Sequence, residues 1–239
     1  MNIKRLLIFL FVVLLLVNLS LLYPYLTGES ISEYEIEMIN VTRIVDGDTI
    51  ESTAGKIRLK GINCPEKNQL YSEEATEYLK QFQGKEIALE KTGKDRYNRE
   101  LGYLHYQGKL INLEILKNGF GHLYYYEQDK YFSDMKKAEK YARDNEKGIW
   151  RKSKNYGCIE LINLEYNDPE GSKNQEQLIL KNKCNKNLNI IIKDDATHIY
   201  EFSIDKNSLF IKNFTKIWND NGDTLYVWDD FGLLLWERY

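Results

Sequence analysis

The chain has 239 residues, enough for one large or two modest domains with a proper hydrophobic core. Hydrophobic residues make up 43% and charged residues 29%, which excludes wholesale disorder. The net charge of −3 at pH 7 argues against a uniformly basic nucleic-acid coat protein. Any phosphate-binding site must therefore be built from individually placed arginines.

The N-terminal segment, residues 1–27, has the pattern of a signal peptide or a membrane anchor. Lys4 and Arg5 precede an almost uncharged run over residues 6–26. As a helix, such a run would be about 30 Å long, which matches the core of a bilayer. The preceding positive charge predicts export of everything that follows. We favour a retained anchor because no good small-residue cleavage site is present, and we expect an acidic linker over residues 28–37.

Residues 38–152 are predicted to form a first domain that mixes strands with three helices. Strands are expected over 38–45, 49–52, 56–62, 85–92 and 100–106, with a further extended segment over 120–126. Apolar residues at helical spacing, followed by glycine, predict helices over 70–84, 110–119 and 131–148. Because strands and helices do not alternate regularly, a small closed barrel is favoured over a doubly wound sheet.

Residues 158–239 are predicted to form a second domain without helices. Seven short strands rich in Ile, Leu, Tyr and Trp recur about every ten residues, which favours an antiparallel immunoglobulin-like β-sandwich. The boundary is expected near residues 153–157. Cys158 and Cys184 both fall in this domain; they could form a disulfide outside the cytoplasm, or remain two buried free thiols.

The stretch VDGDTIESTAGKIRLKGINCPE carries the residues of greatest chemical interest. A three-residue hairpin loop at TAG would place Ile50 opposite Arg58, and would put Asp48 and Arg58 on one face of the sheet. The bend that follows would return Asn63 and Glu66 to the same end. One guanidinium and two carboxylates are thus expected to converge.

This convergence suits hydrolysis of a phosphodiester. Asp48, the amide oxygen of Asn63 and the backbone carbonyl of Cys64 are oxygen ligands for a hard divalent cation. Glu66 could take the proton of an attacking water. The planar guanidinium of Arg58 would stabilise negative charge on the phosphoryl oxygens.

A second arginine comes from the stretch DRYNRELGYL. Arg99 would be a further phosphate partner, with Tyr97 as a stacking ring and Arg96 nearby. Taken alone, each signal is weak, since Asp-Gly-Asp is most often a turn and a lone loop arginine is most often a solvated charge.

Over residues 41–150 the chain resembles the staphylococcal nuclease (thermonuclease) family, through VDGDT, IRLKGINCPE, DRYNRELGYL, NLEILKNGFG and EKGIW. The resemblance implies a mainly β fold with some α: a five-stranded OB-fold barrel with three helices. It also implies calcium-dependent cleavage of DNA and RNA. The residue roles that it implies are calcium ligation by Asp48 and by the Cys64 carbonyl, phosphate binding by Arg58 and Arg99, general base catalysis by Glu66, and nucleotide contact by Tyr97 and Tyr125.

Asn63 departs from the family pattern, which has a calcium-binding aspartate at this position. An amide oxygen still coordinates a cation but carries no charge, and calcium affinity follows the charge of the ligands. We therefore expect weaker calcium binding or a preference for another divalent metal.

Residues 158–239 resemble a lamin-tail domain, through IELINLEYN, EQLILKNKC, IKDDATHIYEF and WNDNGDTLYVWDDFG. This resemblance implies an immunoglobulin-like sandwich and, in bacterial and archaeal relatives, fusion to secreted nucleases; the ligand of this domain stays open. The sequence as a whole predicts an exported nuclease, either secreted or membrane-anchored with its catalytic domain outside. The alternative is a catalytically impaired OB-fold module that binds nucleic acid or a surface.

Overall fold

The computed structural model describes residues 9–10, 12–15, 35–125, 128–166, 176–196, 198–215, 217–219 and 222–239, and it divides into a unit of residues 1–35 and a unit of residues 36–239. In the first unit, residues 9–10 and 12–15 are helical. Most of the predicted signal or anchor segment, residues 1–27, lies outside the described residues. Within the described part, no helix combines the length and the apolar character needed to span a membrane.

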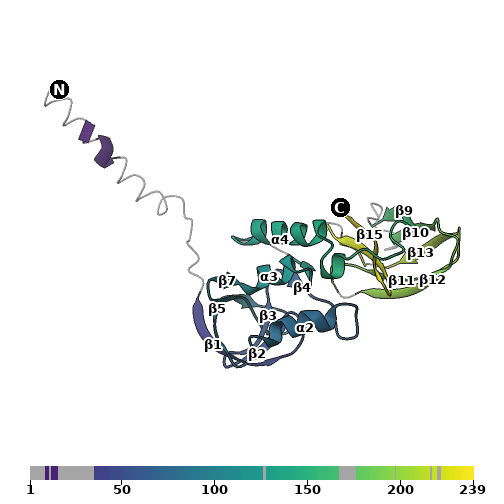
Figure 1. The fold of residues 1–239 in the computed structure, drawn as a ribbon. Helices are drawn as coiled ribbons and strands as arrows, with labels where there is room; N and C mark the ends of the chain where they lie inside the picture. Colours follow the sequence, from purple (N-terminus) through teal and green to yellow (C-terminus); the bar gives the residue numbers. More distant parts are fainter. Residues whose placement is uncertain are drawn as a thin grey trace. The chain divides into compact units, whose positions relative to one another are not determined.

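A closed barrel of five strands opens the second unit (Figure 1). Strand β1 (Ile36–Ile44) pairs antiparallel with β2 (Thr49–Ser52) on one side and with β5 (Glu86–Lys94) on the other. Strand β3 (Gly55–Leu59) follows β2, and β6 (Glu100–Tyr106) follows β5. Parallel pairing of β3 with β6 closes the barrel, which confirms the predicted fold.

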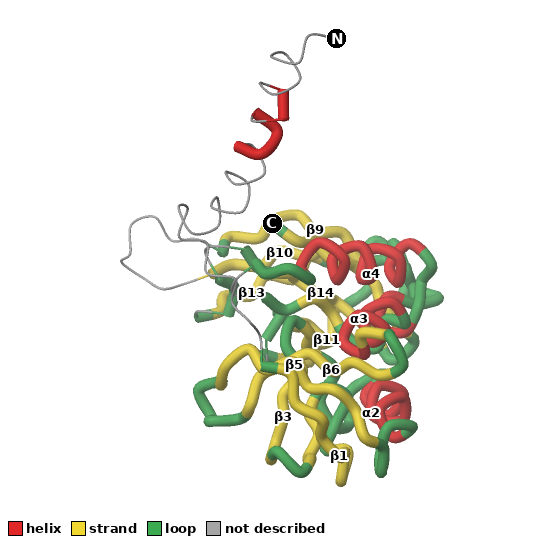
Figure 2. Tube along the Cα trace, turned by 90° about the vertical axis from the view of Figure 1, so that its left-hand side faces the viewer, coloured by secondary structure: helices red, strands yellow, loops and turns green. Residues whose placement is uncertain are grey.

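Three short strands and three helices complete this domain. Strand β7 (Lys109–Leu110) extends β6, while β4 (Ile62–Asn63) pairs with β8 (His122–Leu123). Figure 2 shows the three helices on one side of the strands: α2 (Ser72–Lys80), α3 (Ile111–Lys117) and α4 (Phe132–Asp144). Each buries an apolar stripe at helical spacing; in α4 the stripe consists of Met135, Ala138 and Ala142.

Downstream of the barrel, the described residues form the antiparallel sheets expected of the predicted β-sandwich. A first antiparallel sheet has the order β13-β10-β9, and a second has the order β12-β11-β14-β15. Cys158 and Cys184 form a disulfide, which settles the alternative left open by the sequence, and Cys64 is a buried free thiol. The strands are β9 (Ile159–Glu165), β10 (Glu176–Asn182), β11 (Leu188–Lys193), β12 (Ile199–Ile204), β13 (Leu209–Phe214), β14 (Thr224–Asp229) and β15 (Gly232–Arg238).

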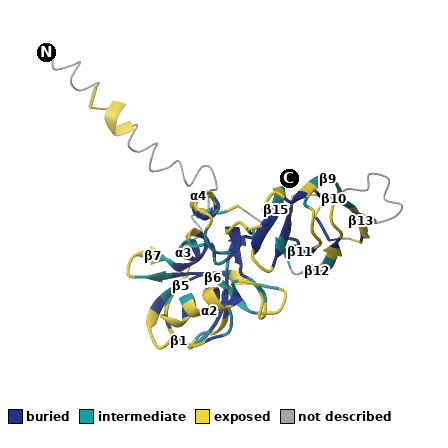
Figure 3. Cartoon of the chain, turned by 45° about the vertical axis from the view of Figure 1, so that its right-hand side comes forward, coloured by how far each residue is buried: buried dark blue, intermediate teal, exposed yellow. Residues whose placement is uncertain are grey.

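A third core joins the barrel to the sandwich. The 3-10 helix η1 (Gly148–Trp150) buries Trp150 against Tyr226 of β14 and Trp236 of β15, with ring centroids 5.8 and 5.7 Å apart. Figure 3 shows that the first half of β15 is buried. The two folds therefore form one compact unit rather than two bodies on a flexible linker.

The β2–β3 hairpin differs from the prediction by one residue. Thr49, not Ile50, lies opposite Arg58, and Ser52 lies opposite Gly55, so the turn has two residues instead of three. The hydroxyl of Ser52 explains the tighter turn, because it accepts a bond from the amide of Ala54 and donates one to the carbonyl of Gly55, both at 3.1 Å.

Candidate active site

The Asp-Gly-Asp turn before β2 packs directly on α2 and on the segment after β4. A side chain at Gly47 would place its Cβ 2.6 Å from the Cβ of Ala75 and 2.8 Å from that of Cys64, closer than real Cβ atoms approach. Glycine is therefore required by close approach. The carboxylate of Asp46 then accepts a bond from the amide of Asp48 at 3.1 Å, which directs Asp48 inward.

Asp48 is buried, and each of its carboxylate oxygens has a partner. Its Oδ2 lies 2.7 Å from Nη1 of Arg58 and accepts a 2.8 Å hydrogen bond from the amide of Cys64. Its Oδ1 accepts a 3.0 Å bond from the hydroxyl of Thr49. Burial raises the pKa of Asp48 to about 6, although the positive charge of Arg58 acts in the opposite direction.

The guanidinium of Arg58 joins two of the predicted oxygen ligands. Nη1 contacts Asp48, while Nη2 donates to Oδ1 of Asn63 at 2.9 Å. Cys64 closes the group through its amide, and its thiol donates to the carbonyl of Gly47 at 3.1 Å. Burial raises the pKa of the Cys64 thiol well above its usual value, so it is a neutral structural group. Asp48, Arg58, Asn63 and Cys64 thus form one cluster.

Glu66 lies on the loop that leaves this cluster. The loop is held by the side-chain oxygen of Gln69, which accepts the amide of Glu66 at 2.9 Å. The side chain of Glu66 is exposed. Among the described residues, no hydrogen bond or ion pair joins its carboxylate to Asp48 or Arg58, so the structure brings Glu66 to the edge of the cluster but not into contact with it.

Arg99 stands just before β6, two residues ahead of Leu101, which pairs with Arg58 in the parallel β3–β6 ladder. The guanidinium of Arg99 is held by Asp95, with Nε 2.6 Å from Oδ2. In the described part of the chain, no contact connects Arg99 to Arg58.

Arg96 and Tyr97 lie at the tip of the β5–β6 hairpin. The ring of Tyr97 is 65% exposed, and the guanidinium carbons of Arg96 and Arg99 lie 4.8 and 5.4 Å from its centroid. An exposed ring between two cations offers a stacking surface next to phosphate-binding charge.

Tyr125 is placed differently from the other predicted nucleotide contacts. It is half-buried, its hydroxyl donates to Asp129 at 2.9 Å and contacts the hydroxyl of Tyr103, and its ring packs on Phe132 at 5.2 Å between centroids. The ring also lies against Gly61, where an added Cβ would come within 2.4 Å of it. The structure thus anchors Tyr125 in the barrel wall.

A groove lies beside the cluster and not over it. Its volume is about 690 Å³, and none of the predicted site residues lines it. Its lining includes Asp46, Glu73, Glu74 and Glu77 but only two lysines, so its charge does not suit a phosphate.

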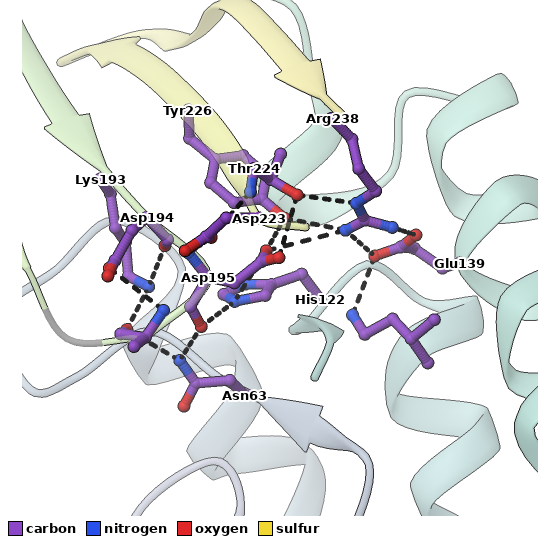
Figure 4. Close-up of polar contacts among 12 residues, drawn as sticks. Asn63, His122, Glu139, Lys193, Asp194, Asp195, Asp223, Thr224, Tyr226 and Arg238 are labelled. Atoms are coloured by element: carbon purple, nitrogen blue, oxygen red, sulfur yellow. Dashed lines mark hydrogen bonds and ion pairs between the residues drawn. The ribbon is translucent and has the colours of Figure 1, made fainter. Parts of the chain in front are cut away.

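Residues of the second domain also contact the cluster, which sequence reasoning did not predict (Figure 4). The amide nitrogen of Asn63 donates to the backbone carbonyls of Asp195 and Ala196, both at 3.0 Å. His122, which pairs with Asn63 across β4 and β8, contacts the same carbonyl of Asp195 through Nε2 at 2.8 Å. Burial holds the pKa of His122 well below its usual value, so a neutral ring donates this bond.

The donor set of the cluster suits a hard divalent cation. Asp48 supplies one carboxylate, Asn63 an amide oxygen and Cys64 a backbone carbonyl, all oxygen donors. Among the described residues, no three His, Cys, Asp or Glu side chains gather into a metal-binding group, so a cation here would depend on one carboxylate and on neutral oxygens.

Comparisons with known proteins identify the family of the barrel region. The family model for the staphylococcal nuclease homologue matches residues 56–152. An uncharacterized endonuclease of Haemophilus influenzae is 33% identical over 143 residues, which cover 57% of this chain and 78% of that protein. The chain belongs to the staphylococcal nuclease family.

Two further similar proteins are also nucleases by name. The thermonuclease of Staphylococcus intermedius is 26% identical over 151 residues, covering 55% of this chain and 90% of that protein. A probable staphylococcal-like nuclease of Oryza sativa subsp. japonica is 34% identical over 110 residues, covering 45% of this chain and 32% of that protein. The family match ends before β9, and family membership supports phosphodiester hydrolysis as the class of reaction.

Proposed function

We propose that the protein is an exported, metal-dependent endonuclease that hydrolyses phosphodiester bonds of DNA and RNA. The observation that carries the proposal is the guanidinium of Arg58, which contacts Asp48 and Asn63 at the base of the loop with Glu66. An arginine held by two partners is oriented before substrate arrives, which is what electrostatic stabilisation of a transition state requires.

The residues divide the reaction as follows. Glu66, exposed beside the cluster, accepts the proton of the attacking water. Arg58 of β3 and Arg99, just before the neighbouring strand β6, bind the phosphoryl oxygens as negative charge develops. Tyr97 stacks on a base, and Arg96 binds the nucleic-acid backbone next to it.

We further propose that the metal is Ca²⁺, held by Asp48, the amide oxygen of Asn63 and the backbone carbonyl of Cys64. When bound, it supplies a Lewis acid that orients water and neutralises phosphate charge. With one carboxylate in the set, calcium binding should be weaker than in relatives with two, which leaves another divalent ion as the alternative.

Export is supported by two independent features. Lys4 and Arg5 precede an apolar run, the pattern of a signal peptide or anchor. The Cys158–Cys184 disulfide suits an oxidising compartment. For the second domain we propose the lamin-tail family, on the sequence resemblance of residues 158–239.

A plasmid-cleavage assay with Ca²⁺, with a series of other divalent ions and with a chelator tests the proposal. We expect cutting that the chelator abolishes. Glu66→Gln, Arg58→Lys and Arg99→Lys should each lower kcat by about 100-fold or more, with unchanged far-UV circular dichroism. Arg43→Ala is the control, because among the described residues the side chain of Arg43 pairs only with Glu51, at the surface.

Two outcomes would contradict the proposal. Binding of DNA without cutting under every metal would identify a binding module instead of an enzyme. Full activity in Glu66→Gln would remove Glu66 from the mechanism.

A further inference from the structure

Both the nitrogen and the oxygen of the Asn63 side-chain amide make hydrogen bonds. Its nitrogen donates to the carbonyls of Asp195 and Ala196, both at 3.0 Å, so both N–H groups have partners in the second domain. Its oxygen accepts from Nη2 of Arg58 at 2.9 Å. Asn63 is only 6% exposed, so water does not replace these bonds readily. One side chain thus connects the backbone of the sandwich to the predicted phosphate-binding arginine.

An ionised aspartate could not make these contacts. It has acceptors only, so at position 63 one carboxylate oxygen would face two carbonyl oxygens. The contact with the second domain therefore accounts for the amide at the position where the family pattern has an aspartate. The contact between the two domains therefore requires the amide of Asn63, which an aspartate could not replace.

The backbone that Asn63 grips is itself held firmly. The carbonyl of Ala196 also accepts from the buried ammonium of Lys193 at 2.7 Å. The amide of Asp195 donates to Asp223 at 2.9 Å, and the carboxylate of Asp195 accepts from the hydroxyl of Tyr226 at 2.9 Å. The segment that carries the two carbonyls is therefore held by hydrogen bonds within the second domain as well as by Asn63; Figure 4 shows Lys193, Asp195, Asp223 and Tyr226 around it.

The contact is part of a larger interface between the barrel and the sandwich, which we call the seam. Arg238 of β15 reaches the buried carboxylate of Glu139 in α4 at 2.8 Å, and Nε1 of Trp228 donates to the carbonyl of Ile149 at 3.1 Å. A cavity of about 100 Å³ in the same seam is lined on one side by Pro65 and residues 68–71, which flank Glu66 in the chain, and on the other by strands β11, β12 and β14. The second domain thus borders both the Arg58 cluster and the Glu66 loop.

We propose that the second domain completes the nuclease site, and that Asn63 is the positioning residue through which its 194–196 segment orients Arg58. The proposal rests on the proposed function for its catalytic consequence. Loosening the seam frees Asn63, and Arg58 then samples orientations that do not fit the phosphoryl group. Turnover falls while substrate binding, which is spread over many charges, changes little.

The test uses the full chain and three variants. Asn63→Asp removes the two donors, whereas Arg238→Ala and Trp228→Phe loosen the seam without touching the cluster. Arg43→Ala is the matched surface control. Three readouts are compared: hydrogen exchange in peptides over 62–64 and 193–196, NMR rotation rates of the Arg58 guanidinium, and kcat with KM for DNA cleavage. Thermal melts exclude unfolded protein.

We expect about tenfold faster exchange in both peptides, faster rotation of the Arg58 guanidinium and about tenfold lower kcat, with KM within about threefold of wild type. Arg238→Ala and Trp228→Phe decide the catalytic consequence, because Asn63→Asp also alters a predicted metal ligand. The proposal is overturned if these two variants speed exchange while kcat and the Arg58 signal stay unchanged, or if Asn63→Asp keeps full protection. If the wild type cuts nothing, the proposed function fails, and exchange and NMR still decide the positioning role.

Discussion

Gly47 shows how one residue fixes the position of Asp48. The turn presses against Cys64 and Ala75, and a methyl group at Gly47 has no room. Gly47→Ala should push the turn away from Cys64 and break the bond between its amide and Asp48, so stability falls by about 1–3 kcal/mol. Because Asp48 also holds Arg58, activity should fall further than the loss of folded protein explains.

Urea unfolding and plasmid cleavage, measured on the same preparation, check this prediction for Gly47→Ala. Specific activity is referred to the folded fraction. Wild-type activity per folded molecule would mean that the turn supports stability alone.

At this scale the sequence predicted the meeting of Asp48 with Arg58, but through a wrong register. The expected three-residue loop placed both side chains on one face by strand pairing, whereas the hydroxyl of Ser52 tightens the turn to two residues. Asp48 stands before β2, so the Asp46 turn and the amide of Cys64 set its direction instead. The register was predicted wrongly because these hydrogen bonds of the turns cannot be read from residue spacing.

Among the elements, Glu90 connects β5 to the start of α4 and to β6. This buried carboxylate accepts from the hydroxyl of Tyr131 at 2.7 Å and contacts Lys130 at 2.8 Å and His105 at 3.1 Å. Burial alone would raise the pKa of Glu90, but the bonds from Lys130, Tyr131 and His105 outweigh it and hold the pKa below its usual value.

The lowered pKa makes the stability contribution of Glu90 depend on pH. A carboxylate whose pKa is lower in the folded state stabilises above the unfolded value of about 4.5, and this contribution disappears as pH falls through the folded value. Glu90→Gln should therefore lower Tm at pH 7, and the difference from wild type should shrink below about pH 4.5. Thermal melts across this range measure it.

Glu77→Gln is the control for Glu90→Gln, because Glu77 makes only an exposed pair with Lys80. Its Tm should follow wild type at every pH. A Glu90→Gln difference that stays constant down to pH 3 would contradict the assignment, since a steric defect has no such dependence.

The elements themselves were predicted closely because their signals are local. Strands β2 and β6 have the predicted bounds, and apolar spacing located all three barrel helices. The predicted strand over 56–62 instead ends at Leu59, because Gly61 has φ of +78° and turns the chain. The sequence left the Cys158–Cys184 pairing open, because it depends on how β9 and β10 meet in the folded domain.

For the whole molecule, the sequence predicted two domains but not the seam between them. Asn63 and Asp195 are separated by 132 residues in the chain, and no pattern at either position signals the other. Likewise, Trp150 lies within the matched nuclease region, residues 56–152, yet packs against strands of the sandwich. Long-range packing of this kind needs coordinates.

The shared core predicts that the second unit unfolds in one step. Trp150→Ala removes a fully buried ring between the barrel and the sandwich, and should cost about 3–5 kcal/mol of unfolding free energy. Because Tyr226 and Trp236 lose their partner, the loss should appear equally in probes of either domain. Hydrogen exchange across barrel and sandwich peptides during urea unfolding measures it.

Phe231→Ala provides the comparison for Trp150→Ala, since this aromatic side chain is 52% exposed and its loss should change stability little. Two separate transitions in wild type, one for each fold, would contradict the prediction of a single unfolding unit.

The ion pair between Arg238 of β15 and Glu139 of α4 also has a consequence for the order of folding during synthesis. Arg238 follows Glu139 by 99 residues, so a growing polypeptide has the whole barrel sequence long before this guanidinium emerges from the ribosome. Until then the buried carboxylate of Glu139 lacks that partner, and Trp150 lacks the strands that cover it. The barrel should therefore reach its full stability only after β15 has formed and packed against it.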